Sequence, residues 1–229
     1  MNRPQLLTML ALQGTLNSAV NPEWVTAGCP FLRAAFVESG EAMDHYGWKW
    51  WKKQIPNVEQ FGVELIDILH FYLSHTLVCN GGDLDDSASR IMQSTVDIDR
   101  GHVRGVTFDD QYYSFTELDT PAKVELLGGL AVARRASWPL LYDLFAAAGM
   151  TEDDVFGIYV GKNVLNMFRQ ANGYKEGTYI KDWFGEEDNQ VMSRLLANLS
   201  SVDPDDLPMC LEAALSEEYA KVTNAATYV

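Results

Sequence analysis

Apolar residues along this chain recur mainly at the spacing of an α-helix, and few segments show the strict alternation of a half-buried strand. Prolines, glycines and asparagines between these segments mark where helices begin and end. The pattern therefore predicts an all-α fold. The predicted helices cover approximately residues 6–17, 30–45, 58–78, 121–148, 154–171, 182–200 and 209–222.

The segment 83–121 shows a weaker pattern than the rest of the chain. Aspartates and glycines interrupt its apolar residues, so we expect a loop-rich insert or cap that contains one short helix. A length of 229 residues suits one domain with a sizeable core. The sequence has no internal repeat or low-complexity linker, and we interpret residues 1–229 as a single all-α domain.

Charge and cysteine content argue against several classes of protein. Lys and Arg number 17 against 32 Asp and Glu, and the net charge of −15 argues against a sequence-independent DNA or RNA binder. The three cysteines are far apart, which argues against a disulfide framework or a zinc site and favours a reducing compartment. No window holds about 18 uninterrupted apolar residues, and the N-terminus makes a poor signal peptide, so we expect a cytoplasmic protein without a membrane partner.

Two pairs of acidic residues lie on two consecutive predicted helices. Glu38 and Glu41 are three residues apart and therefore share one helix face. Glu64 and Asp67 repeat this spacing on a helix that is apolar over most of its circumference, which predicts that they face an interior groove. Buried carboxylates need cations, and oxygen ligands without a thiolate favour Mg²⁺ or Mn²⁺ over zinc. The alternative is that each pair belongs to an ordinary solvated helix face.

A stripe of cationic and amide side chains lies on the predicted helix 154–171. Lys162, Asn166 and Arg169 are spaced i, i+4 and i+7, and a loop with glycines and tyrosines follows them. Such a stripe can hold phosphate oxygens by charge-assisted hydrogen bonds, and metal ions together with Lys and Arg commonly surround a transferring phosphate. The alternative is that basic residues near a helix C-terminus interact only with the helix dipole.

Three motifs connect these residues to a known family. They are ESGEAMDHYGWKWWK at 38–52, VELIDILHFYLS at 63–74 and GKNVLNMFRQANGYKEGTYIKDWFGEEDN at 161–189. Together they resemble the dimeric all-α dUTPase family, which belongs to the all-α NTP pyrophosphatase superfamily with MazG-type and phage dCTPase/dUTPase enzymes. The paired acidic motifs alone indicate the superfamily, whereas WKWWK, the HF dipeptide and the third motif point to dUTPases.

The resemblance implies a helical bundle of the all-α NTP pyrophosphatase type, an acid-lined core that binds Mg²⁺, and a homodimer. From the four acidic residues we expect two or three Mg²⁺ ions. By this resemblance the metal ligands are Glu38, Glu41, Glu64 and Asp67. The phosphate-binding residues are Lys162, Asn166, Arg169, Tyr174, Tyr179 and Lys181. The base and sugar contact Gln13, Asn17, Trp48, Trp51, His70, Phe71 and Asn189, where the two tryptophans are chosen for their i, i+3 spacing.

The function implied by this resemblance is Mg²⁺-dependent hydrolysis of dUTP to dUMP and pyrophosphate, with dUDP as a further substrate. Glu38 is the expected general base and Glu41 the second choice. Two alternatives stay open: a phage-like dCTPase or broader dNTP pyrophosphatase, and a non-catalytic nucleotide-binding dimer. Single residues also have simpler interpretations, since His70 and Phe71 can be core residues and the tryptophans an interface patch.

Overall fold

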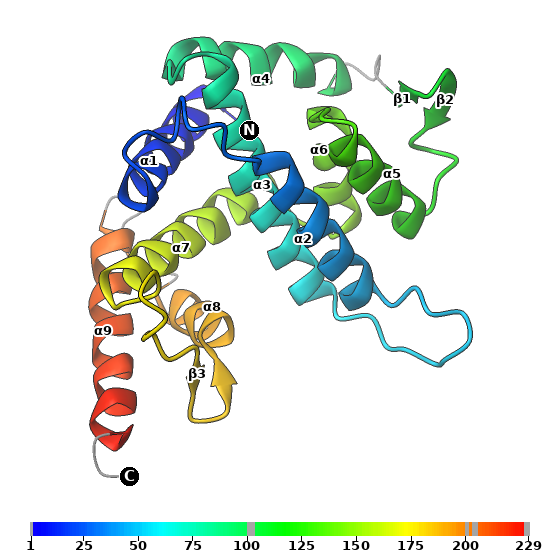
Figure 1. Ribbon diagram of the computed structural model, residues 1–229. Helices are drawn as coiled ribbons and strands as arrows, with labels where there is room; N and C mark the ends of the chain where they lie inside the picture. The colour runs from blue at the N-terminus through cyan, green and yellow to red at the C-terminus, as the bar shows by residue number, and fades with distance from the viewer. Residues whose placement is uncertain (1, 100–103, 200–201, 203–205, 227–229) are drawn as a thin grey trace.

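The computed structural model describes residues 2–99, 104–199, 202 and 206–226 (Figure 1). Within these residues the fold is all-α, as the sequence predicts, apart from two short antiparallel hairpins. The helices are α1 (Arg3–Val20), α2 (Phe31–Tyr46), α3 (Val58–Cys79), α4 (Leu84–Asp99), α5 (Thr120–Val132), α6 (Trp138–Ala147), α7 (Glu152–Ala171), α8 (Asp188–Asn198) and α9 (Leu207–Ala226). The strands are β1 (Gly105–Phe108) paired with β2 (Gln111–Ser114), and β3 (Asp182–Trp183) paired with β4 (Glu186–Glu187).

The segment 83–121 contains more regular structure than the expected loop-rich insert. Helix α4 has 16 residues, and the β1–β2 hairpin lies between α4 and α5. The Asp83 carboxylate accepts a hydrogen bond of 2.8 Å from the backbone N–H of Asp86, and Asp85 and Asp86 lie in the first turn of α4. Carboxylates at a helix N-terminus cap free N–H groups and interact favourably with the helix dipole. These aspartates therefore begin a helix, whereas the sequence pattern suggested that they interrupt one.

Two other predicted helical segments differ in their boundaries. The segment 121–148 forms two helices, because the chain turns after α5 at Arg134, which has a φ of 63°, and α6 begins anew with a proline in its first turn. The segment 182–200 begins as the β3–β4 hairpin, which turns at Phe184 and Gly185 with φ values of 59° and 90°. Helix α8 starts only at Asp188, so this hairpin determines where the first residues of α8 lie.

Helix α3 lies at the centre of the larger of two hydrophobic clusters. Helix α2 packs along it, and α1, α4, α5 and α6 lie around this pair (Figure 1). Phe61, Leu65, Leu69 and Leu73 of α3 are fully buried in this cluster. By length and composition α3 could cross a membrane, but 78% of its most apolar window is buried inside the protein, as expected of a core helix.

The smaller hydrophobic cluster joins the second half of α7 to β3, α8 and α9. Leu165, Phe168, Trp183 and Met192 are among its buried residues. The first half of α7 instead packs into the larger cluster, where Tyr159 is fully buried. Helix α7 therefore connects the two clusters, and side chains on its middle turns face the space between them.

Candidate active site

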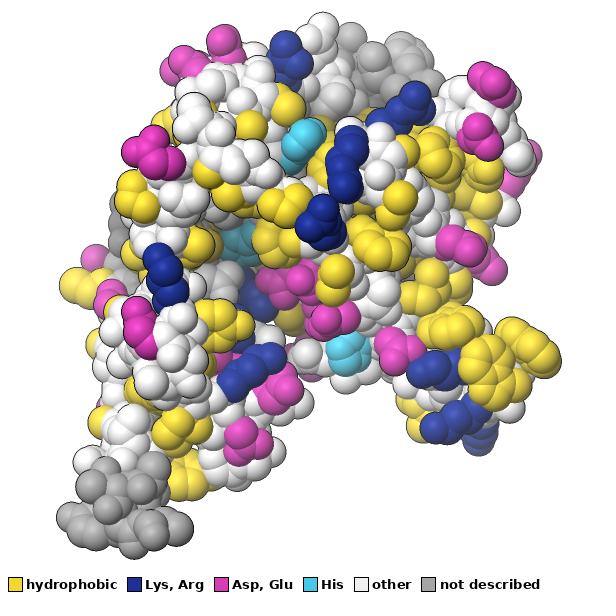
Figure 2. All heavy atoms as spheres, in the orientation of Figure 1, with side chains coloured by type: hydrophobic (Ala, Val, Ile, Leu, Met, Phe, Trp, Pro, Cys, Tyr) yellow, Lys and Arg dark blue, Asp and Glu magenta, His cyan; other side chains and the backbone are white. Residues whose placement is uncertain are grey.

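A cavity of about 920 Å³ lies between the two hydrophobic clusters and opens on the face shown in Figure 2. Helices α1, α2 and α3 line one side, and α7 with the segment 174–190 lines the other. Trp48, Trp51 and Tyr179 are not among the lining residues. The predicted site residues that do line the cavity are Gln13, Asn17, Glu38, Glu41, Glu64, Asp67, His70, Phe71, Lys162, Asn166, Arg169, Tyr174, Lys181 and Asn189.

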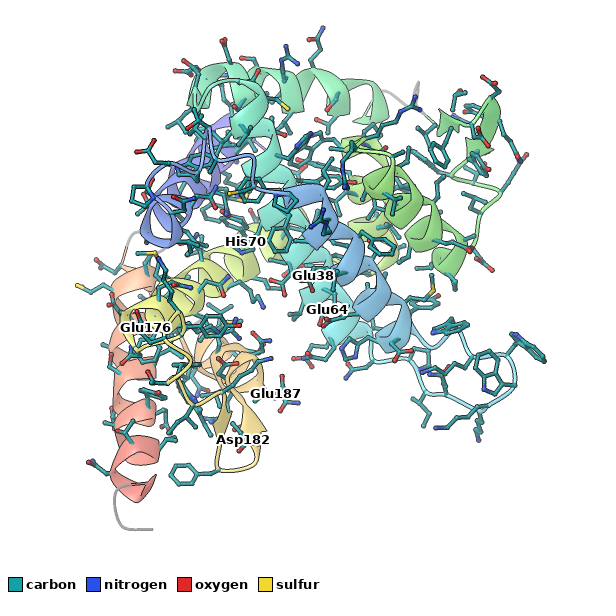
Figure 3. All side chains as sticks on the ribbon, in the orientation of Figure 1. Glu38, Glu64, His70, Glu176, Asp182 and Glu187 are labelled. Atoms are coloured by element: carbon teal, nitrogen blue, oxygen red, sulfur yellow. The ribbon has the colours of Figure 1, made fainter. Side chains whose placement is uncertain are left out.

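An acidic cluster, defined here as Glu38, Glu41 and Glu64, lies on the α2–α3 wall of the cavity. The carboxylate oxygens of the three residues lie within 4.8 Å of one another. Figure 3 shows Glu38 and Glu64 next to each other on the side of the helices that faces α7. Burial, together with the negative charge of Asp67, raises the pKa of Glu38 to about 7 and that of Glu64 to about 8. Carboxylates crowded in this way are ionised together only when a cation compensates their charge.

Asp67, the fourth predicted metal ligand, lies beside the acidic cluster and is paired with Lys162. The ammonium Nζ of Lys162 lies 2.8 Å from Asp67 Oδ2 and 3.0 Å from Asn189 Oδ1, and the side chain is buried. The positive charge of Lys162 also lowers the pKa values of Glu38 and Glu64 against the effect of burial. Lys162 thus contacts the acidic wall and the opposite wall of the cavity at once. Its role in phosphate binding stays a prediction.

The guanidinium group of Arg169 is held by Asp188, which is completely buried. Arg169 donates from Nε to Asp188 Oδ2 at 2.7 Å and from Nη2 to Asp188 Oδ1 at 2.8 Å. Tyr179 donates its hydroxyl proton to the same carboxylate at 2.9 Å, and Asn166 accepts from Arg169 Nη1 at 2.9 Å. A bidentate pair fixes the plane of a guanidinium group. Tyr179 therefore supports Arg169 from behind and does not line the cavity.

The end of the cavity between α1, α3 and α7 contains a chain of buried polar side chains. Gln13 Oε1 lies 2.7 Å from His70 Nδ1 and accepts a hydrogen bond of 2.9 Å from Tyr159. Gln13 Nε2 donates to Asn17 at 3.0 Å, and Asn17 donates to Ser74 at 3.0 Å. Burial lowers the pKa of His70 to about 3, so its ring is neutral. Amides and a neutral imidazole are suited to hydrogen-bond an uncharged base or sugar.

The tryptophans of WKWWK lie on the segment between α2 and α3, which projects from the rest of the chain at the lower right of Figure 1, and none of them lines the cavity. Helix α2 ends at Gly47, whose φ of 86° favours glycine, so the residues after it are not helical. The helical i, i+3 spacing therefore does not apply to Trp48 and Trp51, and their contact with the base stays a prediction. Their rings pack on each other with centroids 5.1 Å apart, and Trp50 beside them is 88% exposed. Within one chain these tryptophans do not reach the cavity.

Among the residues that the sequence analysis did not select, His45, Tyr159 and Asp188 contact predicted site residues by ion pairs or hydrogen bonds. His45, one turn after Glu41 on α2, has its Nε2 3.5 Å from the nearest oxygen of Glu64. Tyr159 contacts the polar chain and Asp188 holds Arg169, as described above. Extending the helix-face argument by one turn from Glu41 would have found His45. The signal for Asp188 was its place in the EEDN sequence, while nothing distinguished Tyr159 from a core tyrosine.

The geometry of the site agrees with a family comparison. A family model described as dUTPase matches residues 5–174, well over half of the chain. The chain belongs to the dUTPase family. No curated protein sequence matches it. As a dUTPase family member it has the activity of a dUTP diphosphatase, a nucleotide pyrophosphatase. The dUTPase match includes the acidic cluster and the stripe of Lys162, Asn166 and Arg169, whereas Asp188 and Asn189 lie beyond it.

Proposed function

We propose that this member of the dUTPase family is a Mg²⁺-dependent enzyme that hydrolyses dUTP to dUMP and pyrophosphate and also accepts dUDP. The observation that carries the proposal is that the acidic cluster and the stripe of Lys162, Asn166 and Arg169 face one cavity. Hydrolysis of a phosphate chain needs a metal site and cationic side chains around the same phosphorus. In a protein with a net charge of −15, cations gathered at this cavity favour a compact anion as ligand.

The donor set of the acidic cluster supports Mg²⁺ as the metal. Glu38, Glu41 and Glu64 offer carboxylate oxygens within 4.8 Å of one another, and hard divalent cations prefer oxygen ligands. Asp67 lies beside them and would complete the set once Lys162 turns toward a phosphate. Bound Mg²⁺ would neutralise phosphate charge and activate water. We propose two or three Mg²⁺ ions, with Mn²⁺ as an acceptable substitute.

The side chains of the site have distinct proposed roles. Glu38 is our choice for the general base and Glu41 the second choice, because both carboxylates belong to the acidic cluster and line the cavity where the phosphate chain would lie. Lys162, Arg169 and Lys181 bind phosphate oxygens and stabilise the charge that develops on them. Lys181 is available for this role, because among the described residues it forms only a long ion pair of 3.8 Å with a carboxylate oxygen of Glu187 at the exposed rim.

The test of this proposal is product release from dUTP by Glu41→Gln and Glu64→Gln. Each amide keeps the shape of the side chain but is a poor Mg²⁺ ligand, so we expect turnover to fall by about 100-fold or more. The exposed Glu125 on α5 provides the control, and Glu125→Gln should leave turnover unchanged. Chelation should abolish activity, and Mg²⁺ or Mn²⁺ should restore it. Unchanged turnover in both cluster variants would overturn the assigned site.

Two alternatives differ from the proposal in their substrate, and a third differs in having no turnover. A panel of dUTP, dCTP, dTTP and dATP separates them, and we expect dUTP to have the highest kcat/KM. A dominant dCTP activity would identify a dCTPase, and similar rates for all four a broader dNTP pyrophosphatase. Nucleotide binding without hydrolysis in the presence of Mg²⁺ would indicate a non-catalytic nucleotide-binding dimer.

We also propose that the protein is a homodimer in the cytoplasm. Phe36 and Val37 on the outer face of α2 are 48% and 49% exposed, and an apolar groove of about 290 Å³ lined by Pro30, Phe31 and Ala34 lies beside them. A second copy seated on this face would remove apolar surface from water. Sedimentation should show a dimer at micromolar concentration, and a monomer would contradict the proposal. The three free cysteines are compatible with a reducing compartment.

A further inference from the structure

One ring nitrogen of His70 has no hydrogen-bond partner in the part of the chain that the structure describes. This atom, Nε2, is buried, and the residue as a whole is only 4% exposed. The ring lines the cavity, and Figure 3 shows His70 where α3 and α7 converge. A buried polar atom without a partner costs about 1–3 kcal/mol. A ligand group that pairs with Nε2 therefore gains more than it would at a solvated site.

The hydrogen bonds on the other side of the ring decide whether Nε2 donates or accepts. The Ser74 hydroxyl has two acceptors within reach, the backbone carbonyl of His70 at 2.9 Å and Asn17 Oδ1 at 3.3 Å. It donates to the nearer carbonyl, and its oxygen accepts from Asn17 Nδ2 at 3.0 Å. Asn17 Oδ1 then accepts from Gln13 Nε2 at 3.0 Å, which turns Gln13 Oε1 toward His70 Nδ1 at 2.7 Å. An amide oxygen can only accept. The proton of the neutral ring is thus on Nδ1, and Nε2 carries the lone pair.

Tyr159 holds this arrangement from the α7 side. Its hydroxyl lies 2.9 Å from both Gln13 Oε1 and the Met9 carbonyl and donates toward them. Its ring stacks on the His70 imidazole with centroids 4.3 Å apart and an interplanar angle of 24°. Tyr159 is fully buried and does not line the cavity. It therefore acts on a bound ligand only through Gln13 and His70.

We propose that Tyr159 and Gln13 hold His70 in its Nδ1–H tautomer so that Nε2 accepts a hydrogen bond from the bound nucleotide. Tyr159 is then a positioning residue. The inference rests on the proposed dUTP substrate, whose deoxyuridine carries two donors, the N3–H of uracil and the 3′-hydroxyl of deoxyribose. If N3–H is the donor, His70 also discriminates against dCTP, because cytosine has a lone pair in place of this hydrogen.

The first test reads the tautomer directly in the full-length protein without nucleotide. ¹⁵N NMR of the histidine rings should show the His70 proton on Nδ1, and Tyr159→Phe should shift part of the population to Nε2–H. A proton on Nε2 in the wild type would overturn the proposal. A Tyr159→Phe protein that melts at a lower temperature with unchanged His70 shifts would show that Tyr159 is only structural. His75→Gln, on the same helix but outside this cavity, is the matched control and should leave the His70 signals unchanged.

The second test identifies the donor on the nucleotide. We compare kcat/KM for dUTP, N3-methyl-dUTP and 2′,3′-dideoxy-UTP in the wild type and in His70→Phe, which keeps a ring beside Tyr159. The analogue that lacks the partner of Nε2 should be about 10- to 100-fold poorer than dUTP in the wild type, and this penalty should nearly disappear in His70→Phe. Penalties of equal size in both proteins, for both analogues, would overturn the inference.

Failure of the proposed function is distinguishable from failure of this inference. If the wild type does not hydrolyse dUTP with Mg²⁺, the proposed function fails, yet NMR still reports the tautomer. In that case the affinities of the same three nucleotides, measured by calorimetry, are compared in place of kcat/KM. Binding that is weakened by loss of one donor in the wild type, and not in His70→Phe, would support the inference without any turnover.

Discussion

Replacing Glu64 by Gln should stabilise the metal-free protein near neutral pH while it abolishes activity. Burial raises the pKa of Glu64 from its ordinary 4.5 to about 8. Between these two values the folded protein holds a proton that the unfolded chain has released. The free energy of unfolding therefore falls as pH rises through this range, and protonation at lower pH restores it. A glutamine carries no charge at any pH and does not make this contribution.

The size of the effect follows from the shifted pKa. One pH unit corresponds to about 1.4 kcal/mol for a proton bound only in the folded state, which gives at most about 2.7 kcal/mol between roughly pH 5.5 and 7.5. Glu64 lines the cavity and can gain some solvation there, so we expect about 1–2 kcal/mol. Glu38, whose pKa is raised to about 7, contributes with the same sign in the wild type and in the variant.

Urea unfolding in EDTA at roughly pH 5.5 and 7.5 measures how much the free energy of unfolding changes with pH in each protein. Wild type and Glu125→Gln should lose stability as pH rises, and Glu64→Gln should lose about 1–2 kcal/mol less. Mg²⁺ should stabilise the wild type more at the higher pH and should have little effect on Glu64→Gln. Two results would contradict this reasoning: the same pH dependence in all three proteins, or a Glu64→Gln protein that is less stable at both pH values. Either would show that burial does not raise the pKa of Glu64.

Three further substitutions test other parts of the structure. Asp188→Asn leaves Arg169 without its buried counter-ion, and the free energy of unfolding should fall by about 3 kcal/mol with a lower kcat/KM; a neutral effect would contradict the pairing. Leu69→Ala in the core should cost about 2–5 kcal/mol in chemical denaturation, and less than about 1 would place it outside the core. Thr151→Ala removes the capping box of α7 and should lower stability by about 1 kcal/mol, with no loss expected if the cap is absent in solution.

The helices could be predicted from the sequence because their apolar faces repeat over several turns. Helices α2, α3 and α7 agree closely with the predicted 30–45, 58–78 and 154–171. The prediction failed where short-range geometry decides the structure. The aspartates before α4 cap a helix, and the β3–β4 hairpin depends on a turn at Phe184 and Gly185. Neither feature produces a hydrophobic period.

In the candidate site, too, only part of the arrangement could be predicted from the sequence. Residues that share a helix face, such as Glu38 with Glu41 and Lys162 with Arg169, lie in one cavity because helical spacing fixes their direction. Contacts between distant segments could not be predicted in this way. Asp188 meets Arg169 only because the β3–β4 hairpin returns the chain to α7, and Tyr159 meets Gln13 only because α7 packs on α1. The choice of Trp48 and Trp51 relied on helical spacing beyond the end of α2, so the argument for it fails and their contact with the base stays a prediction.

The most direct test of the proposed function is a product analysis of dUTP incubated with the wild type and with Glu64→Gln, each with Mg²⁺ and with EDTA. We expect dUMP and pyrophosphate in equal amounts from the wild type with Mg²⁺, and about 100-fold less or none under the other three conditions. Products that appear equally in EDTA, or equally from Glu64→Gln, would contradict a metal-dependent site at the acidic cluster.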